Sequence, residues 1–151
     1  MRSGFSNRVI SLQSEIQMSQ IAAIQFQKYE EDNGFLCVYE SGQKVPFEIK
    51  RVFSVSAKGG DIRGDHAHKK CTQLLVCVSG AIRVVCDNGS VKSVHRLDGM
   101  WNGLLIPPGI WSTQEYLVDN AVLMVMCDRG YEAADYIRDY NDFKTFLAQG
   151  K

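Results

Sequence analysis

The stretch "GDIRGDHAHKKCTQLLVCVSG", residues 60–80, decides the fold. It places two of the chain's three histidines, His66 and His68, one residue apart and just ahead of an apolar run. Successive side chains of a β-strand point to opposite faces, so both imidazoles project from the same face. Glycine stands at both ends of the stretch, which therefore predicts two strands between turns, with a convergent pair of histidines.

The spacing G-x5-H-x-H-x4-Q-x6-G resembles the first motif of the cupin superfamily, which has glutamate where this chain has Gln73. The second cupin motif follows a P-x-G turn, and Pro107-Pro108-Gly109 supplies one. Ser112 then stands where a third histidine ligand belongs. Glutamine and serine are poor substitutes for glutamate and histidine as ligands of a divalent metal, so we expect a cupin without a metal.

The rest of the chain agrees with an all-β fold. Short apolar runs alternate with Gly, Asn and Asp turns, which is typical of a sandwich or barrel; the runs are FLCVYE (35–40), PFEIKRVFSVS (46–56), TQLLVCVSG (72–80), AIRVVCD (81–87), VKSVHRL (91–97), MWNGLLIP (100–107) and AVLMVMCD (121–128). Asn88-Gly89 predicts a tight hairpin turn. At the C-terminus, Asn141 is positioned to cap a short helix whose apolar face is Phe143, Phe146 and Leu147. The predicted fold is an all-β cupin, a double-stranded β-helix (jelly-roll) barrel with a short C-terminal helix.

Composition narrows the function classes. The chain of 151 residues has 17 basic and 17 acidic side chains, so no net charge attracts nucleic acid or an anionic membrane. Five widely spaced cysteines, without a C-x-x-C pair, indicate reduced thiols. Residues 1–17 lack a signal-peptide core, and no apolar run is long enough to span a membrane. We expect a cytoplasmic protein, with residues 1–17 as a poorly structured extension and residues 18–151 as a single cupin domain.

Four motifs in order, "IKRV" (49–52), "RGDHAHKK" (63–70), "PPGIW" (107–111) and "DYIRDYNDF" (135–143), resemble the dTDP-4-keto-6-deoxyglucose 3,4-ketoisomerases. The resemblance covers about residues 20–148. It implies a dimeric cupin, without metal or other cofactor, that acts on a dTDP-linked 4-keto-6-deoxy sugar. It also implies N-terminal strands exchanged between subunits, and a product used for the deoxyamino sugars of glycans such as O-antigens and S-layers.

The chain departs from this family at three positions. Phe53 stands where the family usually has tyrosine, and so lacks a phenol that could hydrogen-bond. Ser112 replaces His or Arg, and Asn33 replaces Arg or Tyr. By the resemblance, positions 33 and 112 lie by the sugar and bear on which C4 epimer forms.

Moving a carbonyl from C4 to C3 of a hexose requires removal of the C3 proton, an enediolate, and protonation at C4. Histidine suits this work because its ordinary pKa, about 6.5, lets it accept and return a proton near neutrality. By the resemblance, His66 is the base, and His68 relays protons or donates to the enediolate. Arg51, Arg63 and Lys69 are candidates for binding the diphosphate, because cations bind phosphate oxygens.

The predicted substrate-binding set is Arg51, Arg63, Lys69, Gln73, Asn33 and Ser112. Two other readings remain open at this point. One is a metal-dependent cupin oxygenase, which Gln73 and Ser112 disfavour. The other is a non-catalytic cupin that binds a sugar nucleotide, which applies if Phe53 and Ser112 have disabled the chemistry.

Overall fold

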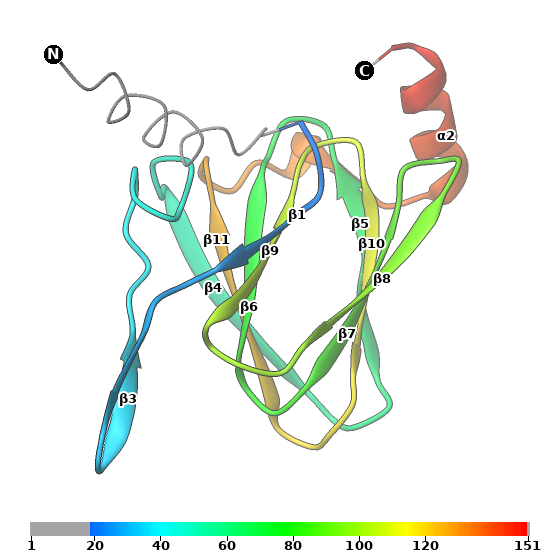
Figure 1. The fold of residues 1–151 in the computed structure, drawn as a ribbon. Coiled ribbons are helices and arrows are strands. Elements are labelled where there is room, and N and C mark those ends of the chain that lie inside the picture. The colour runs from blue at the N-terminus through cyan, green and yellow to red at the C-terminus, as the bar shows by residue number, and fades with distance from the viewer. Residues whose placement is uncertain (1–18, 151) are drawn as a thin grey trace, which may run out of the picture.

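Two five-stranded antiparallel sheets face each other across the core (Figure 1). The computed structural model describes residues 19–150. The first sheet has the order β1 (Ala22–Gln25), β9 (Asn102–Ile106), β6 (Gln73–Ser79), β11 (Ala121–Cys127) and β4 (Arg51–Ala57). The second has the order β12 (Tyr136–Ile137), β5 (Ile62–His68), β10 (Trp111–Tyr116), β7 (Ile82–Asp87) and β8 (Lys92–Leu97). This arrangement confirms the predicted jelly-roll barrel.

The apolar run of β6 forms the centre of the first sheet and is buried on both faces. Leu75 and Cys77 point between the sheets, into a core shared with residues such as Val84 and Leu123. Leu74 and Val76 point to the other face, where an N-terminal segment covers them; its buried residues are Ile24, Phe26 and Val45. Burial on both sides explains why this strand lacks polar alternation.

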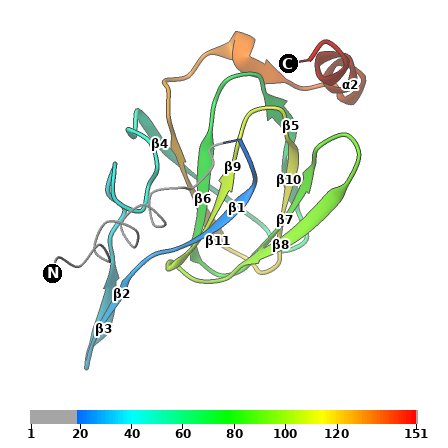
Figure 2. The same ribbon diagram turned by 45° about the horizontal axis from the view of Figure 1, so that its top comes forward.

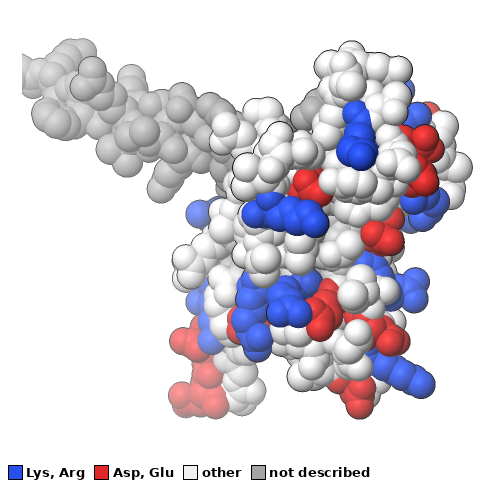
Figure 3. Space-filling model, turned by 90° about the vertical axis from the view of Figure 1, so that its right-hand side faces the viewer, with Lys and Arg blue, Asp and Glu red and all other residues white. Residues whose placement is uncertain are grey.

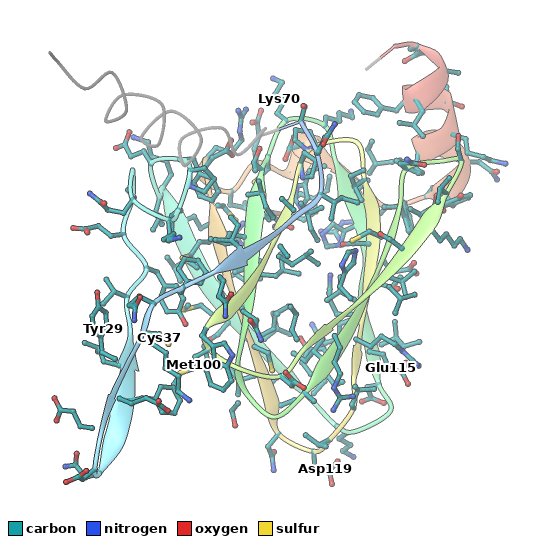
Figure 4. The ribbon with its side chains drawn as sticks, in the orientation of Figure 1. Tyr29, Cys37, Lys70, Met100, Glu115 and Asp119 are labelled. Atoms are coloured by element: carbon teal, nitrogen blue, oxygen red, sulfur yellow. The ribbon has the colours of Figure 1, made fainter. Side chains whose placement is uncertain are left out.

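A hairpin of β2 (Lys28–Glu31) and β3 (Gly34–Cys37) leaves the barrel near the end opposite the C-terminal helix (Figures 1 and 2). Figure 4 labels Tyr29 and Cys37 on this hairpin, outside the two sheets. Large apolar side chains on and just after the hairpin are exposed, namely Tyr29, Phe35, Leu36 and Val38. In the single chain, the hairpin therefore presents apolar surface that no described residue covers.

The connection between β7 and β8 differs in detail from the predicted two-residue turn. Residues 88–91 form the loop, and Gly89 has a positive φ of 91° that suits glycine. Asn88 does not adopt positive φ; its side chain instead accepts hydrogen bonds from the backbone N–H groups of Ser90 and Val91, both at 2.9 Å.

The C-terminal helix α2 (Tyr140–Ala148) has its N-cap two residues before the position that the sequence predicted. Asp139, not Asn141, is the N-cap, and its side chain accepts from the Asp142 N–H at 3.0 Å. A 3-10 turn, η1 (Ala133–Asp135), precedes β12. The predicted apolar face is confirmed: Phe143 is fully buried with Ala67, Trp111 and Ile137, and Phe146 and Leu147 pack against them.

Charge is mixed over the surface. Figure 3 shows Lys and Arg interspersed with Asp and Glu on one face, which agrees with the balanced composition. No helix within residues 19–150 is long and apolar enough to cross a membrane. The predicted extension, residues 1–17, lies outside the described residues.

Candidate active site

A β-bulge in β5 sets the direction of the first histidine. In the pairing of β5 with β10, Ser112 lies opposite His66 and Thr113 lies opposite Gly64, so Asp65 is the extra residue. Gly64 and Asp65 both have positive φ, 80° and 59°. The bulge shifts the alternation by one residue, so that Arg63 and His66, three apart in sequence, both line one cavity. Asp65 instead accepts a hydrogen bond from Trp111 Nε1 at 3.1 Å.

The cavity has a volume of about 210 Å³ and opens between the two sheets. Apolar residues form one part of its wall, namely Phe53, Val55, Leu75, Leu123 and Val125. The polar part consists of Arg51, Arg63, His66, Gln73, Gln114, Tyr136 and Arg138. A small apolar pocket with a few converging polar groups is the usual form of a ligand site.

Three aromatic rings meet beside this cavity. The centroids of the His66 and His68 rings are 5.0 Å apart, and the planes are almost perpendicular at 83°. Tyr136 is the Cα partner of His68 across β12 and β5, and its ring centroid lies 4.4 Å from that of His68 and 5.1 Å from that of His66. The predicted convergence of the two histidines is therefore observed, with a tyrosine added to the pair.

Asp135 holds His68 in place. Its carboxylate lies 2.8 Å from His68 Nδ1 and also accepts from the backbone N–H groups of Lys70, at 2.6 Å, and Cys71, at 3.3 Å. Both partners are buried, with 7% of His68 and 4% of Asp135 exposed. A carboxylate accepts only, so Nδ1 carries the proton and Nε2 of neutral His68 has a free lone pair. Lys70, labelled in Figure 4, marks the end of the barrel where this pair lies.

Both imidazoles favour the neutral form. Burial lowers the pKa of His66 below its ordinary 6.5, and the neighbouring His68 and Arg138 lower it further. Burial also lowers the pKa of His68, although Asp135 opposes this shift. Nδ1 of His66 and Nε2 of His68 are buried without a hydrogen-bond partner. A neutral imidazole can accept a proton, so His66, which lines the cavity, is a candidate base.

Three arginines surround the histidines. Arg51 donates from Nη1 to the Tyr136 hydroxyl at 3.3 Å, and its guanidinium carbon lies 4.6 Å from the Phe53 ring centroid. Arg138 lies over the Tyr136 ring at 4.6 Å, and Arg63 lines the cavity from β5. Within residues 19–150, none of these three arginines forms a salt bridge with a carboxylate. They form a local cluster of positive charge, of the kind that binds phosphate.

The predicted site residues are only partly brought together. The cavity wall contains Arg51, Arg63, His66 and Gln73, whereas Ser112 is buried beside His66, where its hydroxyl accepts from Gln114 Nε2 at 3.2 Å. Lys69 is exposed and lines a separate groove between β12 and α2.

Asn33 lies in the turn of the β2–β3 hairpin, outside the cavity of its own chain. The hairpin projects away from the end of the barrel that carries α2 (Figure 1). A role for Asn33 at the sugar therefore requires a second subunit.

The residues at the cupin metal positions do not fit a metal. Of the four positions, His66 and His68 alone offer a good ligand. The side-chain amide of Gln73 lies 3.7 Å from Cys127 Sγ, and the Ser112 hydroxyl is bonded to Gln114. Ligand atoms of His68, Cys71 and Asp135 also lie within 4.8 Å of one another, but the carboxylate is already hydrogen-bonded to His68 and to two backbone N–H groups.

Sequence reasoning missed four residues of the site, namely Gln114, Asp135, Tyr136 and Arg138. Three of them lie in "DYIRDYNDF", a motif that carries the family resemblance. Their place beside β5 depends on the two-residue strand β12, which no periodicity in the sequence can reveal. Gln114 belongs to strand β10, whose polar sequence contains no apolar run that would predict a strand.

Two antiparallel sheets, with His66 lining a cavity between them and His68 beside it, define a cupin-type barrel. Residues 19–148 match the family described as FdtA: WxcM-like, C-terminal, and the chain belongs to this family. It is 38% identical over 127 residues to the TDP-4-oxo-6-deoxy-alpha-D-glucose-3,4-oxoisomerase of Aneurinibacillus thermoaerophilus, which covers 83% of this chain and 91% of that protein.

Solved structures give the same result. QdtA, a sugar 3,4-ketoisomerase from Thermoanaerobacterium thermosaccharolyticum solved in complex with TDP, superposes with a TM-score of 0.83 at 28% identity. The alignment covers 86% of this chain and 96% of QdtA. The TDP-quinovose 3,4-ketoisomerase WlaRB from Campylobacter jejuni superposes with a TM-score of 0.79 at 30% identity, covering 83% of this chain and 98% of WlaRB.

Proposed function

We propose that this protein is a sugar-nucleotide 3,4-ketoisomerase that converts dTDP-4-keto-6-deoxyglucose into a dTDP-3-keto-6-deoxyhexose. The observation that carries the proposal is the position of His66, an imidazole whose pKa is lowered by burial, in a cavity that is also lined by three arginines. The oxoisomerase of A. thermoaerophilus, 38% identical, is named for the same substrate.

His66 removes the proton from C3 of the sugar. The C4 carbonyl makes this proton acidic, because the electron pair of the C–H bond becomes delocalised onto the C4 oxygen. His68 lies beside His66, with its orientation held by Asp135, and it relays protons or donates to the enediolate. The same imidazole system then returns a proton to C4, so that the reaction is an isomerisation with no net gain or loss of electrons.

Arg51, Arg63 and Arg138 bind the diphosphate of the substrate. A guanidinium presents several N–H donors in one plane and matches phosphate oxygens in pairs. Arg138 lines the cavity and also the groove in which Lys69 lies, so it is placed where the nucleotide leaves the cavity. Lys69 is exposed and contributes at most a screened attraction. Gln73 and Ser112 contact the sugar or support the side chains that do.

The proposal includes a homodimer in which the β2–β3 hairpin of each subunit packs on its partner. The exposed side chains of Tyr29, Phe35 and Leu36 give such a contact its apolar surface. Exchange of the N-terminal strands would bring Asn33 of one subunit toward the cavity of the other. Light scattering should give the mass of a dimer, and Leu36→Asp should shift it toward the monomer without unfolding the barrel.

The test of the function is turnover of dTDP-4-keto-6-deoxyglucose, followed by NMR in deuterated water. The expected result is a 3-keto product and exchange of the C3 proton with solvent. His66→Asn should lower turnover by about 10²–10⁴-fold and leave dTDP affinity nearly unchanged, because the imidazole acts in proton transfer and the arginines bind the nucleotide. His95→Asn, on β8, is the matched control and should keep full activity.

Two outcomes would contradict the proposal. Binding of dTDP without turnover or C3 exchange would favour the non-catalytic sugar-nucleotide-binding cupin. About one equivalent of iron, manganese or zinc per chain, lost together with activity upon chelation, would favour the metal-dependent oxygenase.

A further inference from the structure

The proposed isomerisation moves protons on oxygen as well as on carbon. When the ketone passes from C4 to C3, the hydroxyl at C3 must lose its proton and the oxygen at C4 must gain one. His66 accounts for the proton on carbon, so the oxygens need a second group that gives one proton and accepts another. Phe53 has no exchangeable proton, although the family that this chain resembles usually has a tyrosine at that position.

Tyr136 has the chemistry and the position for this transfer. Among the described residues that line the cavity, Tyr136 is the only one with a hydroxyl group. It pairs with His68 across two adjacent strands, and its ring lies within 5.1 Å of the His66 ring, centroid to centroid. A sugar that presents C3 to His66 therefore lies within reach of the phenol.

Arg51 connects Tyr136 to the place that residue 53 occupies. Its guanidinium stacks on the Phe53 ring and donates a hydrogen bond to the Tyr136 hydroxyl at 3.3 Å. One side chain therefore contacts both the Tyr136 hydroxyl and the Phe53 ring, and both residues line the cavity. Arg138 lies over the Tyr136 ring at 4.6 Å, so two guanidinium groups contact this side chain.

We propose that Tyr136 is a catalytic residue that transfers a proton from the C3 oxygen to the C4 oxygen, in place of a tyrosine at position 53. This inference rests on the proposed function. His66 takes the proton from C3, the C–H electron pair forms the C3–C4 double bond, and the C4 oxygen takes the phenolic proton of Tyr136. The phenolate then takes the proton of the C3 hydroxyl, whose electron pair forms the new ketone, while the double bond takes a proton at C4 from the His66 imidazolium. Each proton lost by the protein is recovered.

The test compares Tyr136→Phe with the double variant Phe53→Tyr/Tyr136→Phe, which moves the phenol to position 53. Product formation and C3 deuterium incorporation are measured together, with dTDP affinity. Tyr136→Phe should lower product formation by about 10²-fold with unchanged dTDP affinity. Because His66 can still remove and return the C3 proton, the ratio of product to C3 exchange should fall at least about tenfold.

The double variant should recover a substantial part of the lost turnover. Tyr131→Phe is the matched control. The guanidinium carbon of Arg51 lies 5.1 Å from the Tyr131 ring centroid, but Tyr131 is exposed and does not line the cavity. It should behave as wild type.

Three results would overturn the inference. Wild-type turnover in Tyr136→Phe would show that the hydroxyl is dispensable. An equal fall in product and C3 exchange, without recovery in the double variant, would indicate a structural role for Tyr136. A wild-type protein without turnover or C3 exchange would remove the proposed function, and the role of Tyr136 with it.

Discussion

Asp135 lies 2.8 Å from His68 Nδ1, although the two residues are 67 positions apart in the sequence. Asp135 ends the 3-10 turn η1, and the short strand β12, which returns to the edge of β5 after the last long strand of the barrel, follows it directly. β12 places Tyr136 at the cavity. Two adjacent residues therefore hold the orientation of one histidine and add a phenol beside both.

The role of this carboxylate can be tested with Asp135→Asn. The single amide oxygen can keep the Lys70 N–H contact, which the carboxylate makes through Oδ1, but the amide NH2 then replaces the Oδ2 atom that accepts from His68 Nδ1 and the Cys71 N–H. Loss of the orienting group should lower kcat by about 10–100-fold, a range typical when the partner that orients a functional histidine is removed. The hydrogen bond and the charge of Asp135 both raise the pKa of His68, so any part of the acidic limb of the pH–rate profile that depends on His68 should move to lower pH in this variant.

Asp128→Asn is the control for this variant. Asp128 accepts from the Thr72 N–H at 3.1 Å in a similar backbone contact, without a histidine partner. Equal losses of kcat in the two variants would mean that Asp135 acts only through the fold.

The pH dependence follows from the lowered pKa of His66. Burial disfavours the imidazolium, so the ring stays neutral at pH values where a free histidine would be partly protonated. kcat/KM should therefore be constant near neutrality and fall only below pH 6.5, the ordinary value. If kcat/KM already falls as the pH is lowered toward 6.5, then ionisation of another protein group or of the substrate controls the rate.

The same shift affects stability. The unfolded chain binds the proton of residue 66 more tightly than the folded chain does, so the free energy of unfolding should decrease as the pH falls below 6.5. His66→Asn should remove part of this decrease in urea unfolding measured at pH 7 and at pH 5.

Much of the fold was predictable because most strands of the barrel coincide with apolar runs in the sequence. The strands β3, β4, β6, β7, β8, β9 and β11 all fall within or overlap runs identified from the sequence, and β5 lies in the stretch 60–80, which predicted two strands. The strands β1, β2, β10 and β12 were missed. β10, "WSTQEY", is polar because its inner face lines the site, and β12 is too short to show a period.

The site was less predictable, for two physical reasons. Strict alternation places Arg63 and His66 on opposite faces, and only the bulge at Asp65 brings them together. Nothing in the composition of "RGD" requires a bulge, although its glycine permits one. The contact of Asp135 with His68 depends on chain topology, and Asn33 lies in a hairpin turn outside the cavity of its own chain.

Diphosphate binding should depend on the arginines of the cavity. Arg51→Ala removes a charged donor, and we expect dTDP affinity to fall by about 10–100-fold, as for the loss of a charge-assisted hydrogen bond. Lys69→Ala should change it less, by about threefold or less, because an exposed ammonium is screened by salt. Arg83→Ala, an exposed arginine of β7 paired with Glu115, is the control. Titration calorimetry gives all three dissociation constants, and equal effects of Arg51 and Lys69 would contradict the assignment.

The stereochemistry at C4 should respond to residue 112. Ser112 is the Cα partner of His66 on the neighbouring strand, so its side chain leaves the sheet on the same face and beside the imidazole. The serine is small and its hydroxyl is bonded to Gln114, so it offers the planar enediolate no acid of its own. A histidine at this position adds a second proton donor next to His66 and also fills space against the ring of the sugar. We therefore expect Ser112→His to change the ratio of the two C4 epimers, while C3 exchange, which His66 performs, continues.

The ratio is read by NMR of the 3-keto product from the wild type and from Ser112→His. Ser112→Ala is the control, because it removes the hydroxyl without adding bulk or an acid. One clean epimer, identical in all three proteins, would mean that residue 112 does not steer protonation and that the face is set by how the sugar is held.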